Sequence, residues 1–144
     1  NSVLYNDHVV AEIFKRYSRS RSIVIYVSDH GETLFDDKRH PDFAGHAGNT
    51  LPDNVVRIPF IVYMSDSLRK EAPELWQQIL KAQDQPVMTD LLPNIFTGLL
   101  GIETKYSRPE LNVFSPHYNP KRQRKVIAVD GAKRVFPALH RSAQ

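Results

Sequence analysis

Residues 22–32 read Ser-Ile-Val-Ile-Tyr-Val-Ser-Asp-His-Gly-Glu, and this stretch carries the strongest indication of the fold. Its apolar part, Ile23 to Val27, is a nearly continuous β-branched run, which is what a strand buried on both faces of a parallel sheet requires. The polar residues Ser28 to Glu32 follow at the carboxyl end of that strand, where open α/β sheets bind their ligands. The stretch therefore predicts an α/β protein with a binding site directly after the strand.

The segments on either side agree with an α/β layer architecture. Ser2 to Tyr17 is predicted to be an amphipathic helix, because its apolar residues recur near helical spacing. Val55 to Met64 contains a second strand of the buried type, with Pro59 near its start. A helix followed by such strands is typical of helices layered on a sheet.

Two further helices are predicted downstream. Ser67 to Lys81 is expected to be helical in part, with Pro73 opening a helix. Thr89 is a suitable N-cap for a helix that runs to about Leu100, and Gly101 is placed to be its C-cap.

A β-hairpin is predicted at the end of the chain. Lys125–Val129 and Ala132–Phe136 flank Asp130-Gly131, a dipeptide typical of a two-residue type I′ turn.

Composition restricts the class of protein. A chain of 144 residues with 41% hydrophobic and 24% charged residues is long enough for one globular domain. Its longest apolar runs are strand-sized and too short to cross a membrane. There is no cysteine, which excludes disulfides, thiolate metal sites and cysteine nucleophiles.

The formal net charge is +3, and much of the basic excess lies in Lys15–Arg21 and Lys121–Lys125. Such clusters are most often solvated faces. Their functional interpretation is attraction to an anionic membrane surface, because basic residues near such a surface are held by its potential. Nucleic-acid binding is disfavoured, since no aromatic-interleaved or helix-turn-helix pattern accompanies the charge.

Candidate metal ligands follow the first predicted strand in the sequence. Asp29 and His30 offer a carboxylate oxygen and an imidazole nitrogen, a suitable pair for Zn²⁺ or Mn²⁺. By itself such a pair is more often a turn with a hydrogen-bonded histidine. Two more histidines, His40 and His46, follow in the His-, Gly-, Asp- and Pro-rich segment 29–53. Long loops of this kind tend to be functional.

Several segments together resemble the bacterial phosphoethanolamine transferases of the alkaline phosphatase/sulfatase superfamily. Tyr26–Glu32 resembles the metal-binding strand end of that family. Other stretches resemble its preceding helix, its next strand, its late helix and its tail, in the same order along the chain: Asn1–Asp7, Ile58–Asp66, Thr89–Pro93 with Gly98–Ile102, and Asn112–Pro116 with Tyr118–Pro120.

The resemblance implies a fold and a site. Residues 1–144 would be the C-terminal part of an alkaline-phosphatase-like catalytic domain, a mainly parallel sheet flanked by helices with a C-terminal hairpin. Asp29 and His30 would bind the catalytic Zn²⁺, with Mn²⁺ or Ca²⁺ as alternatives. His46 would contact a second metal or the phosphate being transferred. Glu32 is expected to position another side chain rather than bind the ion, and His40 has no firm counterpart in the family.

The activity implied is transfer of phosphoethanolamine from phosphatidylethanolamine to lipid A or a cell-envelope glycan, through a phosphothreonine-type intermediate. The family's catalytic part faces the periplasm at the bacterial inner membrane. Its membrane helices, nucleophilic threonine and a further acidic ligand lie upstream of the segments matched here. We therefore expect the 144 residues to be a fragment that is inactive alone, and assign no nucleophile among its threonines: Thr33, Thr50, Thr89, Thr97 and Thr104.

Two other functions remain open from the sequence. A sulfatase, phosphoglycerol transferase or phosphonate hydrolase of the same superfamily would share the metal-binding strand and differ in its nucleophile. A non-catalytic module that binds membranes or glycans through its basic face would show no metal affinity.

Overall fold

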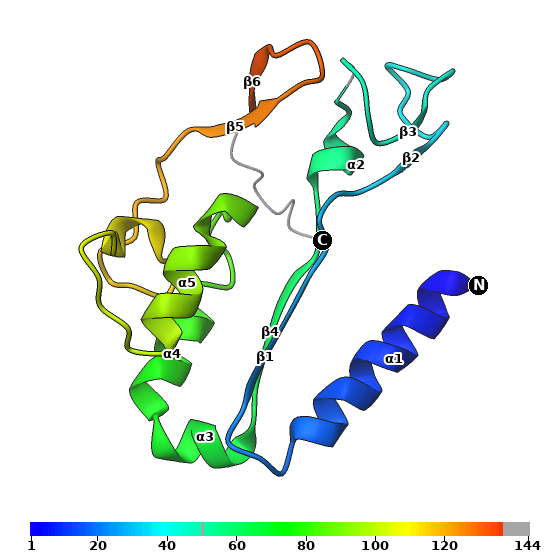
Figure 1. Ribbon diagram of the computed structural model, residues 1–144. Coiled ribbons are helices and arrows are strands. Elements are labelled where there is room, and N and C mark those ends of the chain that lie inside the picture. The colour runs from blue at the N-terminus through cyan, green and yellow to red at the C-terminus, as the bar shows by residue number, and fades with distance from the viewer. Residues whose placement is uncertain (50, 137–144) are drawn as a thin grey trace. The chain divides into compact units, whose positions relative to one another are not determined.

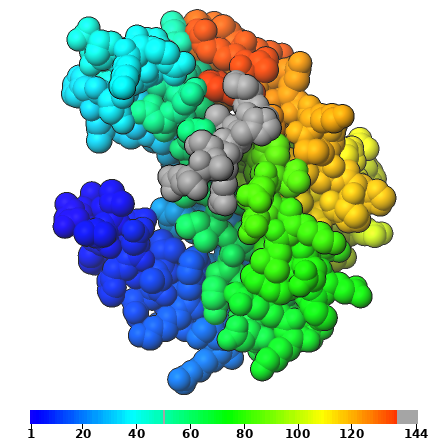
Figure 2. Space-filling view, turned by 180° about the vertical axis from the view of Figure 1, so that it is seen from behind, coloured from blue at the N-terminus to red at the C-terminus, as the bar shows by residue number. Residues whose placement is uncertain are grey.

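The computed structural model describes residues 1–49 and 51–136, and the chain divides into two compact units. The first comprises residues 1–28 and 59–80, and the second takes in residues 29–58 and resumes at residue 81. Figure 1 traces the elements of each unit along the chain, and Figure 2 shows the molecular surface from the opposite side.

In the first unit, a helix lies against a two-stranded ribbon. Helix α1 (Ser2–Tyr17) and strand β1 (Ile23–Val27) occupy the predicted residues. Strand β4 (Phe60–Met64) pairs with β1 in antiparallel register, from Ile23 opposite Met64 to Val27 opposite Phe60. The α/β class is confirmed, but the parallel pairing expected of such strands is wrong for these two. The chain leaves β1 and enters β4 at the same end of the ribbon, so no crossover of the kind parallel strands need is made.

Aromatic side chains hold α1 on the ribbon. The ring of Phe14 stacks on that of Tyr63 with 5.0 Å between centroids, and Asn6 Nδ2 donates to the Tyr26 hydroxyl at 3.1 Å. Every residue of β1 is half-buried, not buried on both faces as the apolar run predicted. The reason is that β1 lies in a ribbon of two strands, which leaves much of its surface uncovered.

The segment after β4 forms two helices, and Pro73 opens the second of them as predicted. Helix α3 (Asp66–Glu71) ends before Pro73, which is the first residue of α4 (Pro73–Lys81). The Arg69 guanidinium lies 4.1 Å from the centroid of the Trp76 ring, and this cation–π contact joins the two helices.

The second unit contains the short helices α2 (Asp53–Val56), η1 (Thr89–Leu91), α5 (Leu92–Leu99) and η2 (Pro109–Leu111). Four of its buried apolar side chains come from η1, α5 and the segment that follows η2: Leu91, Ile95, Val113 and Phe114. Val55 of α2, Ala82 and Ala128 are buried as well. Helix α5 contacts both η1 and η2.

The boundaries of α5 are only partly as predicted. Thr89 is not its N-cap, because a turn of 3₁₀ helix precedes α5, and no side-chain hydrogen bond caps either start. Gly101 is confirmed as the terminating glycine, with φ of 64°. Its N–H donates to Gly98 O at 3.2 Å, and Ile102 N–H donates to Thr97 O at 2.8 Å, the pattern of a Schellman motif.

The predicted C-terminal hairpin is present as β5 (Arg124–Ile127) and β6 (Lys133–Phe136), but its turn differs from the prediction. Ala128 N–H donates to Ala132 O, and Gly131 N–H donates back to Ala128 O. Of the loop residues only Gly131 has positive φ, at 79°. The connection is therefore a three-residue loop with glycine in the left-handed position, not a type I′ turn.

Among residues 1–49 and 51–136, no helix has both the length and the apolar character needed to cross a bilayer.

Candidate metal site

The segment after β1 is pressed against helix α2. Gly31 N–H donates to Val55 O at 2.7 Å. A Cβ atom at Gly31 would lie 1.9 Å from the backbone oxygen of Asn54, so only glycine fits here. This close approach fixes where His30 and Glu32, on either side of the glycine, present their side chains.

A short pair of strands brings His46 close to these two residues. Strands β2 (Thr33–Leu34) and β3 (Ala44–Gly45) form a two-residue antiparallel pair, with Thr33 opposite Gly45. Glu32 precedes β2 and His46 follows β3, so the pairing sets them side by side. Glu32 Oε2 lies 2.8 Å from His46 Nδ1.

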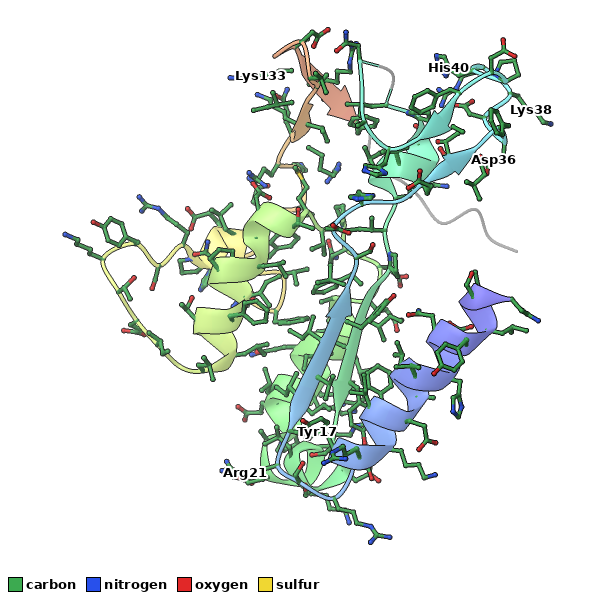
Figure 3. All side chains as sticks on the ribbon, turned by 45° about the vertical axis from the view of Figure 1, so that its right-hand side comes forward. Tyr17, Arg21, Asp36, Lys38, His40 and Lys133 are labelled. Carbon is green, nitrogen blue, oxygen red and sulfur yellow. The ribbon has the colours of Figure 1, made fainter. Side chains whose placement is uncertain are left out.

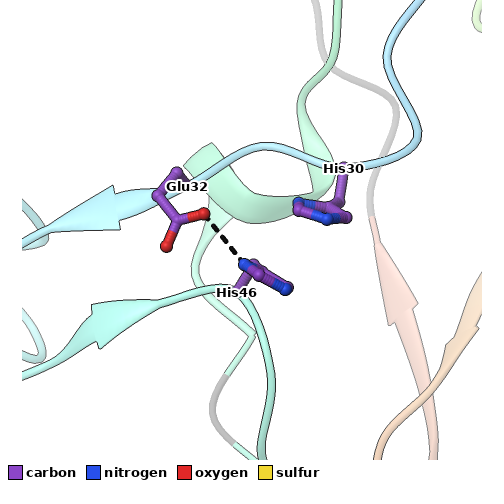
Figure 4. Close-up of side chains that lie close together, drawn as sticks. All are labelled: His30, Glu32 and His46. Atoms are coloured by element: carbon purple, nitrogen blue, oxygen red, sulfur yellow. Dashed lines mark hydrogen bonds and ion pairs between the residues drawn. The ribbon is translucent and has the colours of Figure 1, made fainter.

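Three side chains thus converge, as Figure 4 shows. The rings of His30 and His46 stack with centroids 3.8 Å apart and planes 18° from parallel. One ligand atom from each of His30, Glu32 and His46 lies within 4.8 Å of the others, and this is the grouping of possible metal ligands found in the described part of the chain. We call these three residues the His-Glu-His cluster.

The hydrogen bonds orient both imidazoles. When His46 is neutral, the contact with Glu32 places its proton on Nδ1, which leaves Nε2 as the metal-binding atom. His30 Nδ1 lies 2.9 Å from Gly31 O, which selects the same tautomer. All three side chains are partly exposed, so an ion and a ligand could reach them.

Asp29 stands beside the cluster. Its Oδ2 lies 3.6 Å from His30 Nε2, and its side chain is 87% exposed. Its Oδ1 accepts the His30 backbone N–H at 3.0 Å, and this hydrogen bond lowers the pKa of the Asp29 carboxyl below its usual range. The predicted pair Asp29 and His30 is therefore adjacent in space, with Asp29 outside the grouping that Glu32 joins.

His40 lies elsewhere in the loop, at its outer end (Figure 3). Its Nδ1 is 3.2 Å from Asp37 Oδ2, and Arg39 donates to the same carboxylate. The backbone N–H of Arg39, with the His40 ring, holds the pKa of Asp37 at about 2. Asp37 was not among the residues singled out from the sequence, since aspartates in a polar loop are common and carry no specific pattern.

The donor set suits zinc. The imidazoles of His30 and His46, with the neighbouring carboxylate of Asp29, match the ligands that Zn²⁺ takes in catalytic sites, where three protein ligands leave a position open. Ca²⁺ prefers six to eight oxygens, which the cluster does not offer. The arrangement fits an ion that would be completed by water, by substrate or by further protein oxygens.

Comparison with known proteins identifies the family of the chain. Residues 1–102 match the family model described as Sulfatase. The chain belongs to the sulfatase family. Within this family it is similar to phosphoethanolamine transferases, as residues 26–32 had suggested.

Two relatives show the range of similarity. The Kdo(2)-lipid A phosphoethanolamine 7''-transferase of Salmonella typhimurium is 36% identical over 66 residues, 46% of this chain and 11% of that protein. Phosphoethanolamine transferase EptC of Escherichia coli is 27% identical over 120 residues, 82% of this chain and 20% of that protein. The chain thus spans a fifth or less of the length of these relatives.

A solved structure confirms the fold. The crystal structure of the C-terminal periplasmic domain of EptC from Escherichia coli superposes with a TM-score of 0.71 at 26% identity. The match covers 88% of this chain and 38% of that domain. The same domain in complex with Zn superposes with a TM-score of 0.69 at 25% identity, over 83% of this chain and 35% of that one.

Proposed function

We propose that this chain is the C-terminal part of the catalytic domain of a zinc-dependent phosphoethanolamine transferase. The observation that carries the proposal is the convergence of His30, Glu32 and His46 within 4.8 Å, next to Asp29. The names of the relatives, and the zinc complex of the solved EptC domain, support the choice of reaction and metal.

Each residue has a proposed part. Asp29 and His30 bind the catalytic zinc, and His46 contacts a second metal or the phosphoryl group. Glu32 holds the His46 ring by its hydrogen bond to Nδ1. A bound zinc would lower the pKa of an attacking hydroxyl and neutralise charge on the phosphoryl oxygens.

The nucleophile is proposed to lie outside the 144 residues. The Thr33 hydroxyl is buried and donates to Asn54 Oδ1, and that of Thr97 donates to Pro93 O within α5. Thr104 Oγ1 accepts the N–H of Tyr106. Thr89 begins η1, and Thr50 lies outside the described residues. None of the described threonines belongs to the His-Glu-His cluster.

The names of the relatives support a choice of acceptor. We propose phosphatidylethanolamine as donor and lipid A, or another envelope glycan, as acceptor. The names of two relatives include lipid A, and the solved domain is described as periplasmic. The proposed location is therefore the periplasmic side of the bacterial inner membrane.

Zinc titration of the 144-residue chain tests the metal site. We expect weak binding that drops by about tenfold or more in Asp29→Ala, His30→Ala and His46→Ala. His117→Ala is the matched control, because His117 is exposed and belongs to no metal cluster in the described residues. Zinc affinity unchanged by all three substitutions would overturn the proposal.

An activity assay tests whether the nucleophile lies outside the 144 residues. Incubated with zinc, phosphatidylethanolamine and lipid A, the isolated chain is expected to transfer no phosphoethanolamine. Measurable transfer would show that the nucleophile lies within the 144 residues.

A second candidate is a hydrolase of the same family, which the match of residues 1–102 to the Sulfatase model favours. Hydrolysis of an aryl sulfate by a protein that contains this chain, without phosphoethanolamine transfer, would decide for it.

A further inference from the structure

The β5–β6 hairpin has one face made of lysines and exposed aliphatic side chains. Residues directly opposite in an antiparallel pair share a face, so Lys125 with Val135 and Ile127 with Lys133 lie on the same side. The two lysines stand at diagonal corners, and the two aliphatic residues occupy the others. We call these four residues the outer face of the hairpin.

This face is open to solvent. Ile127 is 67% exposed and Val135 58% exposed, and Val129 in the adjoining loop is 77% exposed. Figure 3 shows Lys133 projecting from the hairpin. The opposite face is better covered, since Arg124, Val126 and Phe136 are half-buried and only Arg134 on that face is exposed. The exposed side of the hairpin therefore carries basic and apolar groups together.

No carboxylate belongs to the outer face within residues 124–136. The nearest acidic residue by sequence, Asp130, is engaged at the loop: its Oδ1 accepts the Ala132 N–H at 2.9 Å, and its Oδ2 lies 3.6 Å from Arg134. The face therefore offers uncompensated positive charge together with aliphatic surface.

The hairpin is also tied to the loop that carries the metal ligands. Asp130 N–H donates to Asn49 Oδ1 at 2.9 Å, and Asn49 stands three residues after His46. A partner that docks on the outer face would therefore be held by the same unit as the His-Glu-His cluster.

We infer that the outer face of the hairpin docks on an anionic lipid surface. Lysines near such a surface are attracted by its negative potential, while short aliphatic side chains enter the headgroup boundary. Charge complementarity commits the face to this partner. The inference goes beyond the proposed function and does not depend on a metal, so failure of one leaves the other standing.

Vesicle binding by the 144-residue chain in the presence of EDTA tests the inference. We expect binding to vesicles of phosphatidylethanolamine and phosphatidylglycerol (3:1) and none to phosphatidylcholine. Lys125→Gln with Lys133→Gln should weaken binding roughly 25-fold, about fivefold for each lysine. The matched control is Arg16→Gln with Arg19→Gln, which removes the same charge elsewhere and should change binding less than about twofold. Equal losses in both double variants would overturn the inference, since binding would then follow net charge.

A fluorescent label tests whether the outer face of the hairpin enters the lipid surface. Because the chain has no cysteine, Ile127→Cys allows a single environment-sensitive label. Its emission should shift to the blue on anionic vesicles. The control, Leu100→Cys, labels a residue that is 71% exposed and lies on another element. No shift at position 127, or the same shift at both positions, would contradict docking by this face.

Discussion

Glu32 Oε2 lies 2.8 Å from His46 Nδ1, and this contact decides which nitrogen of the His46 ring can bind a metal. Substitutions that remove the contact lower metal affinity by about 10- to 100-fold in comparable sites. We therefore expect Glu32→Gln, which keeps an acceptor but loses the charge, to weaken zinc binding about tenfold. Glu32→Ala should weaken it further.

A competition titration with a zinc indicator measures this effect, with Glu103→Gln as the control for loss of one exposed carboxylate. If Glu32→Gln binds zinc as the unsubstituted chain does, Glu32 does not orient His46.

Gly31→Ala should disturb the same site by a steric route. The added methyl would meet the Asn54 backbone oxygen at 1.9 Å, and backbone cannot yield by changing a rotamer. We expect a loss of about 3 kcal/mol in the free energy of unfolding, with weaker zinc binding, because His30 and Glu32 flank the glycine.

Gly131→Ala separates this clash from backbone strain. Gly131 has φ of 79°, and a methyl group added there would have no neighbouring atom within 4 Å. Its cost of about 1 kcal/mol therefore comes from φ alone. Urea denaturation measures both variants, and equal costs would argue against the close packing of Gly31 on α2.

Thr33→Val tests a buried hydrogen bond that supports the β2–β3 pair. Thr33 is fully buried, and its hydroxyl donates to Asn54 Oδ1 at 2.8 Å. Valine keeps the shape but leaves the amide oxygen without this donor, which should cost about 1–2 kcal/mol. Thr89→Val, at an exposed position, should change stability by less than about 0.5 kcal/mol. Denaturation midpoints compare the two, and similar small shifts would show that the Thr33 hydroxyl contributes little.

Asp37 should titrate at an unusually low pH. The Arg39 backbone N–H, followed by the His40 ring, lowers its pKa from 3.8 to about 2. A lowered folded pKa means that these contacts stabilise the loop fully above pH 3.8, and that the stabilisation is lost as pH falls toward 2. An NMR titration of the Asp37 carboxyl carbon measures the midpoint, which His40→Ala should move upward. A midpoint near 3.8 in the unsubstituted chain would contradict the contacts.

The secondary structure of the first unit could be predicted from its sequence. Helical spacing of apolar residues in α1 and the β-branched run of β1 are local signals that need no knowledge of the rest of the chain. The same holds for Gly101, because a helix end that needs φ of 64° favours glycine whatever surrounds it. Strand direction was not a local property. The run from Ile23 to Val27 suits either pairing, and the return path of residues 28–59 made it antiparallel.

The candidate metal site could also be predicted only in part. The residue types after β1 predicted metal chemistry, since a carboxylate and an imidazole at a strand end are ligands wherever they fold. Which of them converge was decided by contacts between distant segments. The two-residue pairing of β2 with β3 is too short to leave a periodic pattern, yet it sets Glu32 against His46. The ligand chemistry and the local helices and strands followed from the residue types alone. His40 pairs with Asp37 through a local turn, three residues apart. The meeting of Glu32 with the two histidines was settled only in the folded chain, because it depends on the pairing of β2 with β3.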